Sequence, residues 1–198
     1  MTRGRIAYVV LACALSLSGC ALLGGGSSEP LDTYALTAAT PEPGQRSRRQ
    51  ILIAEPTAIQ ALDGQGIVIK PEANVIQTLK GAQWADRLPR IVQARLAETF
   101  QRSGRYGGVG KPGEGLAIDY QVVVDVRSFE IRVDGADRAE VALYVQLLND
   151  RNGVVRSSRL FNATVPVSGS DNDAFVAALD RAFGIVATEI VNWTATQI

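Results

Sequence analysis

Residues 116–133 decide the fold, and their sequence is LAIDYQVVVDVRSFEIRV. Apolar and polar side chains alternate along most of the stretch: Ile118, Tyr120, Val122, Val124, Val126 and Phe129 are interleaved with Asp119, Gln121, Asp125 and Arg127. Successive side chains of a strand point to opposite faces of a sheet, so this pattern predicts one long strand with one buried face. Because such a strand is prone to aggregate as a free edge, we expect it to be central or paired with another copy.

The segments that follow predict two further strands and a helix. Asp134-Gly135 is typical of a hairpin turn, and strands are expected at 140–148 and 154–165. Asp171 or Asp173 can then cap a final helix. Its apolar stripe at helical spacing is Phe175, Leu179, Ala182, Phe183, Val186, Ile190 and Trp193.

Upstream of the long strand, the sequence predicts four shorter strands and a first helix. The strands are expected at 33–36, 51–54, 66–70 and 74–79. The helix is indicated by Leu88, Ile91, Val92, Leu96 and Phe100, which fall on one helical face. Asp86 is a candidate N-cap, Pro89 fits the first turn, and Gly104 suits the end of the helix. Trp84, just before the helix, is expected to pack on the core.

The order of elements indicates the fold class. Four strands, a helix, room for one short strand, three strands and a last helix allow hairpins between neighbours. Each helix has one apolar stripe, so both helices can cover the same face of a sheet. The sequence therefore predicts an α+β fold with a mixed, mainly antiparallel sheet covered by two helices.

The N-terminus has the features of a bacterial lipoprotein signal. Two arginines precede the apolar run 6–17, which is shorter than the roughly 20 residues that a spanning helix needs. The run ends in Leu17-Ser18-Gly19-Cys20, which resembles a lipobox. We therefore expect residues 1–19 to be removed as a signal peptide. Cys20 would then carry an S-diacylglycerol and an N-acyl group such as palmitate, which anchor the protein to a membrane.

A tether and one domain are expected after the lipidation site. Residues 20–31 predict a flexible tether, and the ten residues 21–30, in which Gly and Ser dominate, reach about 18 Å on average and at most about 35 Å. Residues 32–198 are expected to form a single periplasmic α+β domain. Ala21 stands where an Asp would resemble an inner-membrane retention signal, so the outer membrane, facing the periplasm, is favoured over the inner membrane.

Composition argues against several classes of function. The chain has 20 basic residues (Lys and Arg) and 20 acidic residues (Asp and Glu), so no excess of positive charge favours binding to nucleic acid. The chain has no His, which removes Ser-His-Asp and Cys-His catalysis and most zinc sites. Gly107–Gly113 lacks the order of a phosphate loop and predicts a flexible turn. We expect no catalytic residue, no metal, no cofactor and no enzymatic activity.

Several blocks of the sequence resemble a known family. They are Tyr34-Ala35-Leu36, the strand 51–56, Ile67-Val68-Ile69 and Gln83-Trp84-Ala85-Asp86-Arg87-Leu88-Pro89. The last block is similar to the family stretch W-A-(D/E)-x-L-P. On these residues the chain resembles, over about 32–195, the auxiliary lipoproteins of ABC-type transport systems. These are encoded beside MCE-domain proteins and include the lipoprotein of the Pqi system. The segment 60–64 departs from the pattern, because relatives often carry an aromatic residue there.

The resemblance implies a non-catalytic docking or scaffold component of an MCE-type ABC system for lipids or hydrophobic solutes. Its partners would be an MCE-domain protein and, through it, a permease and an ATPase. It also implies that homo-oligomeric rings can form. Two alternatives stay open: a direct lipid carrier, which needs an internal apolar cavity, and an envelope hydrolase, which would have to work with carboxylates alone.

The apolar stripes of both helices are expected to pack against the sheet. Contacts with a partner are therefore expected elsewhere on the surface. The basic cluster Arg46–Arg49 can dock an acidic partner, although such runs are more often simply solvated. The loop Gly107–Gly113 is the second candidate contact. Val124 is expected to face outward, so that Val124→Glu would break an oligomer without unfolding the domain.

Overall fold

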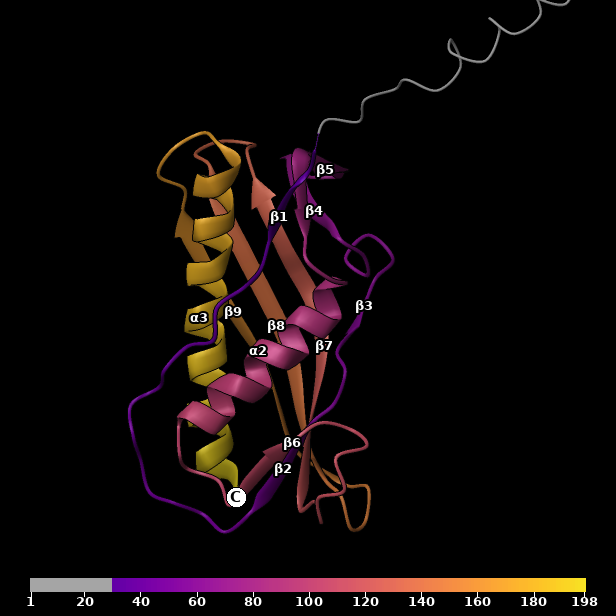
Figure 1. Ribbon diagram of the computed structural model, residues 1–198, viewed down its shortest axis with the longest axis vertical. Coiled ribbons are helices and arrows are strands. Elements are labelled where there is room, and N and C mark those ends of the chain that lie inside the picture. The colour runs from indigo at the N-terminus through magenta and orange to yellow at the C-terminus, as the bar shows by residue number, and fades with distance from the viewer. Residues whose placement is uncertain (1–29) are drawn as a thin grey trace, which may run out of the picture. The chain divides into compact units, whose positions relative to one another are not determined.

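The computed structural model describes residues 30–198 (Figure 1). Leu31–Ile198 form one compact unit. The signal peptide 1–19, acylation at Cys20 and nearly all of the tether lie outside the described residues and stay predictions.

Strand β7 (Tyr120–Arg132) is the centre of a nine-stranded sheet. Along one edge it pairs antiparallel with β8 (Arg138–Asn149), which in turn pairs antiparallel with β9 (Val155–Pro166). The prediction that this long strand is central is therefore confirmed. The strand begins at Tyr120, because the residues from 116 onward form a loop before it.

The other edge of β7 is covered by three short strands laid end to end. They are β2 (Gln50–Ile53), β3 (Thr57–Ala58) and β4 (Gly66–Glu72), and each runs parallel to β7. Hairpin pairing, which we expected between neighbours, joins only β4 to β5 (Val75–Trp84) on this side. Strand β1 (Asp32–Tyr34) adds in parallel to β5.

The segment expected to be only a turn at 107–113 contains strand β6 (Gly108–Gly110), which pairs in parallel with β2. The glycines explain the difference. A Cβ at Gly107 would lie 2.5 Å from the backbone oxygen of Arg48, so only glycine lets the two chains approach this closely. The backbone N–H of Gly107 donates to the carbonyl of Arg49 at 2.9 Å.

Helices α2 (Leu88–Arg102) and α3 (Asn172–Gln197) cover one face of the sheet, as Figure 1 shows. The predicted apolar stripes of both helices are buried, and Trp84 is 1% exposed. The predicted α+β class, with a mixed, mainly antiparallel sheet and two helices, is confirmed.

The helix ends follow the sequence in three of four cases, and Pro89 lies in the first turn of α2 as expected. The Asp171 carboxylate accepts from the N–H of Ala174 at 2.8 Å and caps α3, as expected. Gly104 takes a positive φ of 63° just after α2. The prediction of Asp86 as N-cap of α2 is wrong: Arg87 takes that place without a side-chain bond. The carbonyl of Gly64 instead accepts from the N–H of Leu88 at 2.9 Å.

The expectation that Val124 faces outward is also wrong. Val122, Val124 and Val126 are at most 1% exposed, because they lie on the face that the helices cover. The predicted alternation is correct, but the apolar side chains of the strand, Val124 among them, form its buried face. Val123 and Asp125 occupy the opposite face, which no helix covers among residues 30–198.

Candidate docking surface

The two loops predicted as partner contacts lie side by side at one end of the sheet. The pairing of Gln50 with Gly108 brings the Arg46–Arg49 loop and the Gly107–Gly113 loop together. The turn between β8 and β9 joins them, because the N–H of Asp150 donates to the carbonyl of Asp119 at 3.0 Å. We call this surface, made by residues 45–50, 107–119 and 149–156, the basic end.

Asp119 organises the basic end. Its carboxylate accepts from the backbone N–H of Gln50 at 3.0 Å. It also lies 3.4 Å from the guanidinium of Arg49 and 3.5 Å from that of Arg151. One carboxylate thus connects three chain segments, and its side chain is only 17% exposed.

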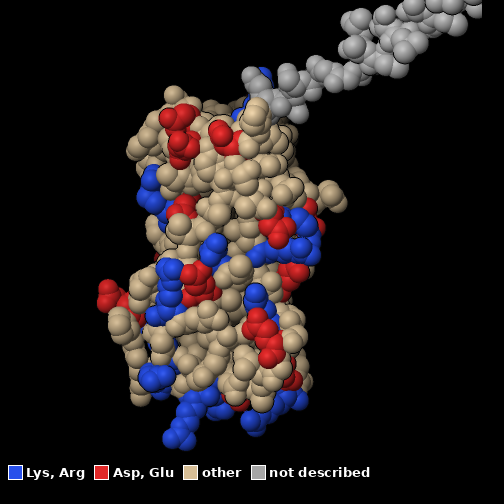
Figure 2. All heavy atoms as spheres, viewed as in Figure 1, with Lys and Arg blue, Asp and Glu red and all other residues tan. Residues whose placement is uncertain are grey.

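Several cations of the basic end remain open to solvent. Arg46 and Arg48 are exposed and make no ion pair with any residue in the described range. The side chain of Arg151 is 77% exposed although it touches Asp119. Figure 2 shows Lys and Arg gathered at the lower end of the molecule. Because one shared carboxylate cannot neutralise both Arg49 and Arg151, the surface keeps a positive excess.

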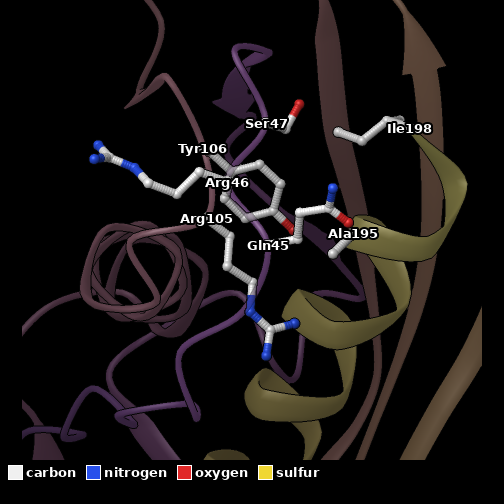
Figure 3. A pocket seen from close by; sticks show the side chains of 7 residues that line it. All are labelled: Gln45, Arg46, Ser47, Arg105, Tyr106, Ala195 and Ile198. Carbon is white, nitrogen blue, oxygen red and sulfur yellow. The ribbon is translucent and has the colours of Figure 1, made fainter.

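A polar hollow of about 260 Å³ lies beside these cations (Figure 3). It is lined by Gln45, Arg46, Ser47, Arg105, Tyr106, Ala195 and Ile198. The hydroxyl of Tyr106 donates to the carbonyl of Val191 in α3 at 2.8 Å, and burial raises the pKa of this phenol. In Figure 3 the Arg46 and Arg105 side chains extend away from each other, so they do not converge on one ligand.

Apolar side chains accompany the cations. Val154 in the β8–β9 turn is 58% exposed, Val155 at the start of β9 is 44% exposed, and Leu116 is 40% exposed. Exposed aliphatic residues beside unpaired cations are typical of a surface that meets another macromolecule.

A second charged cluster of the domain is internally neutralised. On the uncovered sheet face, Glu130 is only 4% exposed and its carboxylate lies 3.1 Å from the ammonium of Lys70. Arg132 and Arg138 both contact Asp134 beside it. Hydrogen bonding to Arg132 holds the pKa of Asp134 below its usual value. This cluster stabilises the sheet and offers little free charge to a partner.

Within residues 30–198, no group of three or more acidic, Cys or His side chains is placed to hold a metal ion. None of the helices in this range is long and apolar enough to cross a bilayer. The basic end thus combines charge and exposed apolar groups without a catalytic arrangement, which suits recognition.

Comparison with known proteins assigns the family. The family model described as the ABC-type transport auxiliary lipoprotein component matches residues 34–191. The chain belongs to this family. A curated, uncharacterized protein from Bradyrhizobium diazoefficiens, bll6063, is 32% identical over 181 residues. These cover 89% of this chain and 48% of that protein, so the chain spans about half of the relative's length.

Solved structures share the fold of this auxiliary lipoprotein. Protein XCC0632 from Xanthomonas campestris is 30% identical with a TM-score of 0.78, covering 83% of this chain and 95% of its own. The Chlamydia trachomatis protein CT253 is 8% identical with a TM-score of 0.55, covering 76% and 98%, and shows similarity of fold alone. The family assignment supports a membrane-anchored lipoprotein that faces the cell envelope.

Sequence reasoning found both loops of the basic end but missed the residue that joins them. Asp119 lies just before β7, and in the sequence it is one polar position of an alternating pattern. Its contacts with Arg49 and Arg151 span large separations in sequence, and no local pattern reports such contacts.

Proposed function

We propose that the protein is a lipid-anchored docking component of an MCE-type ABC system that moves lipids or hydrophobic solutes across the cell envelope. Its direct partner is an MCE-domain protein, which links it to a permease and an ATPase. The anchor is acylated Cys20, and Ala21 favours the outer membrane. The basic end, where open cations lie beside exposed aliphatic residues, is the observation that supports docking most directly.

The position of the basic end relative to the tether supports this role. Leu31 leads into β1, which pairs with β5 far along the sheet from β2, the strand that follows the Arg46–Arg49 loop (Figure 1). The 13 residues of β7 span about 43 Å at about 3.3 Å per residue. The basic end therefore lies well away from Leu31, the residue at which the tether joins the domain, so a partner can contact it without meeting the attachment point.

The alternatives receive less support. A direct lipid carrier needs an enclosed apolar cavity, whereas the most apolar hollow described is a surface groove beside Ile185 of α3. An envelope hydrolase needs converging acid and base groups, whereas the matching family is described as an auxiliary transport component.

The test is recovery of the MCE-domain protein with the full-length lipoprotein from detergent-solubilised envelopes. Arg46→Glu/Arg48→Glu should lower recovery at least about tenfold, since it replaces attraction by repulsion. Arg90→Glu/Arg127→Glu is the matched control, because both of these arginines are exposed away from the basic end. If wild type recovers no MCE protein, the proposed function fails. If both double variants behave alike, docking does not use the basic end.

Acylation is tested separately. Mass spectrometry of the mature protein should find Cys20 as its first residue, with a diacylglycerol thioether. Cys20→Ser should leave the chain unprocessed. A mature N-terminus elsewhere, or a free thiol at Cys20, would contradict the anchor.

A further inference from the structure

Strand β9 leaves one whole edge of the sheet unpaired among the described residues. It pairs with β8 and with no other strand. The N–H of Val167 donates to the carbonyl of Asp137 at 3.0 Å. This bond shows which residues of β9 point their N–H and C=O groups toward β8. Because bonding alternates along an antiparallel pair, residues 157, 159, 161, 163 and 165 bond to β8. The N–H and C=O groups of Ser158, Leu160, Asn162 and Thr164 therefore point away from the sheet.

The free stretch has defined limits. At one limit, Arg156 is an extra residue that forms a bulge. Ser157 and Val155 on either side of it pair with the consecutive residues Leu147 and Leu148 of β8. Pro166 ends the strand and has no N–H to offer. Between these limits the backbone groups of 158–164 form no hydrogen bond with any described residue outside the β8 pairing. Such a row of groups is a template for an added strand.

Side chains next to this edge indicate which strand would fit. On the helix side a groove of about 280 Å³ is lined by Arg159, Glu189, Asn192, Trp193 and Thr196. Arg159 is exposed, with its guanidinium 4.8 Å from the ring of Phe161, and has no carboxylate partner among residues 30–198. Arg156 and Arg181 lie along the same edge, where they donate to the carbonyls of Gln197 and Pro166. Three arginines against Glu189 give the edge a positive excess.

The edge also continues the basic end. Val154, Val155 and Arg156 belong to the basic end, and Val155 and Arg156 are also the first two residues of β9. We propose that an extended, acidic segment of a protein partner adds to the sheet along residues 158–164 of β9, with its carboxylates facing Arg159. This proposal deepens the docking role and rests on it for the identity of the partner.

A second copy of this chain fits the edge less well. Antiparallel pairing of two β9 strands would bring the arginines of both copies into one junction without adding acid beyond a second Glu189. It would also invert one copy, which would place the two Leu31 residues at opposite ends of the paired strands. An acidic segment has neither cost.

A direct binding measurement tests the proposal. The probe is a labelled seven-residue peptide of alternating Glu and Val, titrated by fluorescence anisotropy against the full lipidated protein in detergent micelles. Asn162→Pro removes one outward N–H that the fold does not use, and Asn162→Ala keeps it. We expect Asn162→Pro to weaken binding about fivefold or more and Asn162→Ala to leave it unchanged. The Lys–Val counterpart of the peptide should bind more weakly than the Glu–Val probe. Equal binding to the two variants, or preference for the Lys–Val peptide, would overturn the proposal.

Cross-linking in the intact envelope tests the same edge without relying on a proline variant. A photo-reactive side chain at Leu160 should link to an Asp- and Glu-rich segment of another protein, and one at Ile185 of α3 should not give that adduct. An adduct with a second copy of this chain, or no adduct at Leu160, would overturn strand addition. An acidic segment from a protein outside the transport system would keep strand addition and refute the proposed function.

Discussion

Two neighbouring valines on β7 provide a sharp test of which sheet face is buried. Val124 is 0% exposed under the helices, whereas Val123 lies on the uncovered face opposite Gln146 of β8. Val124→Ala removes two buried methyl groups, worth about 0.8 kcal/mol each, and leaves a cavity. The total loss is about 2–3 kcal/mol of unfolding free energy. Val123→Ala removes the same atoms from a half-buried site and should cost less than about 1 kcal/mol.

The assay is thermal and urea unfolding of the domain 31–198, followed by tryptophan fluorescence. Trp84 and Trp193 are both buried against phenylalanine rings, at centroid distances of 5.8 and 5.4 Å, so their emission reports the core. For a domain of this size, 1 kcal/mol corresponds to about 2–4 °C. Val124→Ala should therefore lower Tm by about 5–10 °C, and Val123→Ala by about 3 °C or less.

Glutamate at the same two positions extends the comparison. A carboxylate at 124 would be buried without a partner, which costs several kcal/mol and approaches the total stability of a typical domain. Val124→Glu should not accumulate as folded protein, whereas Val123→Glu should fold. Equal Tm changes for the two alanine variants would refute the assignment of the covered face.

Three further predictions concern the ends of the helices. Asp171→Ala removes the cap from the N–H of Ala174 and should lower stability by about 1 kcal/mol in urea unfolding. Gly104→Ala forces a β-carbon into a positive φ of 63° and should cost about 1 kcal/mol in the same assay. Tyr34 donates to Asp173 at 2.7 Å, and this bond raises the pKa of Tyr34 to about 12. Its contribution is full below pH 10 and is lost as the pH rises through about 12, so Tyr34→Phe should be less stable than wild type at pH 8 and the difference should shrink in alkaline titration.

The sequence predicted the antiparallel half of the sheet well because its signals are local. Alternation and the Asp134-Gly135 turn place β7 and β8 in one hairpin, and both lie close to the expected limits. The stripe of α3 and its cap at Asp171 are local in the same sense. Boundaries were less accurate for β5, which continues to Trp84 because it pairs with β4 and β1 over that length.

The parallel half could not be predicted from local signals. Parallel strands are joined by long connections, so a strand's parallel partner is distant in sequence. No feature within Gln50–Ile53 or Thr57–Ala58 indicates that both strands pair with β7. The candidate docking surface has the same limitation. Its loops were identified by composition, but their meeting at Asp119 depends on the β2–β7 and β2–β6 pairings.

The two edges of the sheet are protected to different degrees, and this contrast bears on function. On the side away from β9, the outer strands β1 and β6 have three residues each, and β1 covers only Ala82–Trp84 of β5, so residues 75–81 of β5 also lack an outer neighbour among the described strands. Strand β9 has 12 residues, and only the bulge at Arg156 and Pro166 limit its free backbone. An edge of that length exposes a protein to aggregation unless something pairs with it. Because the free edge of β9 is flanked by Arg156, Arg159 and Arg181 and is continuous with the basic end, it is better explained as a binding surface than as an unprotected strand.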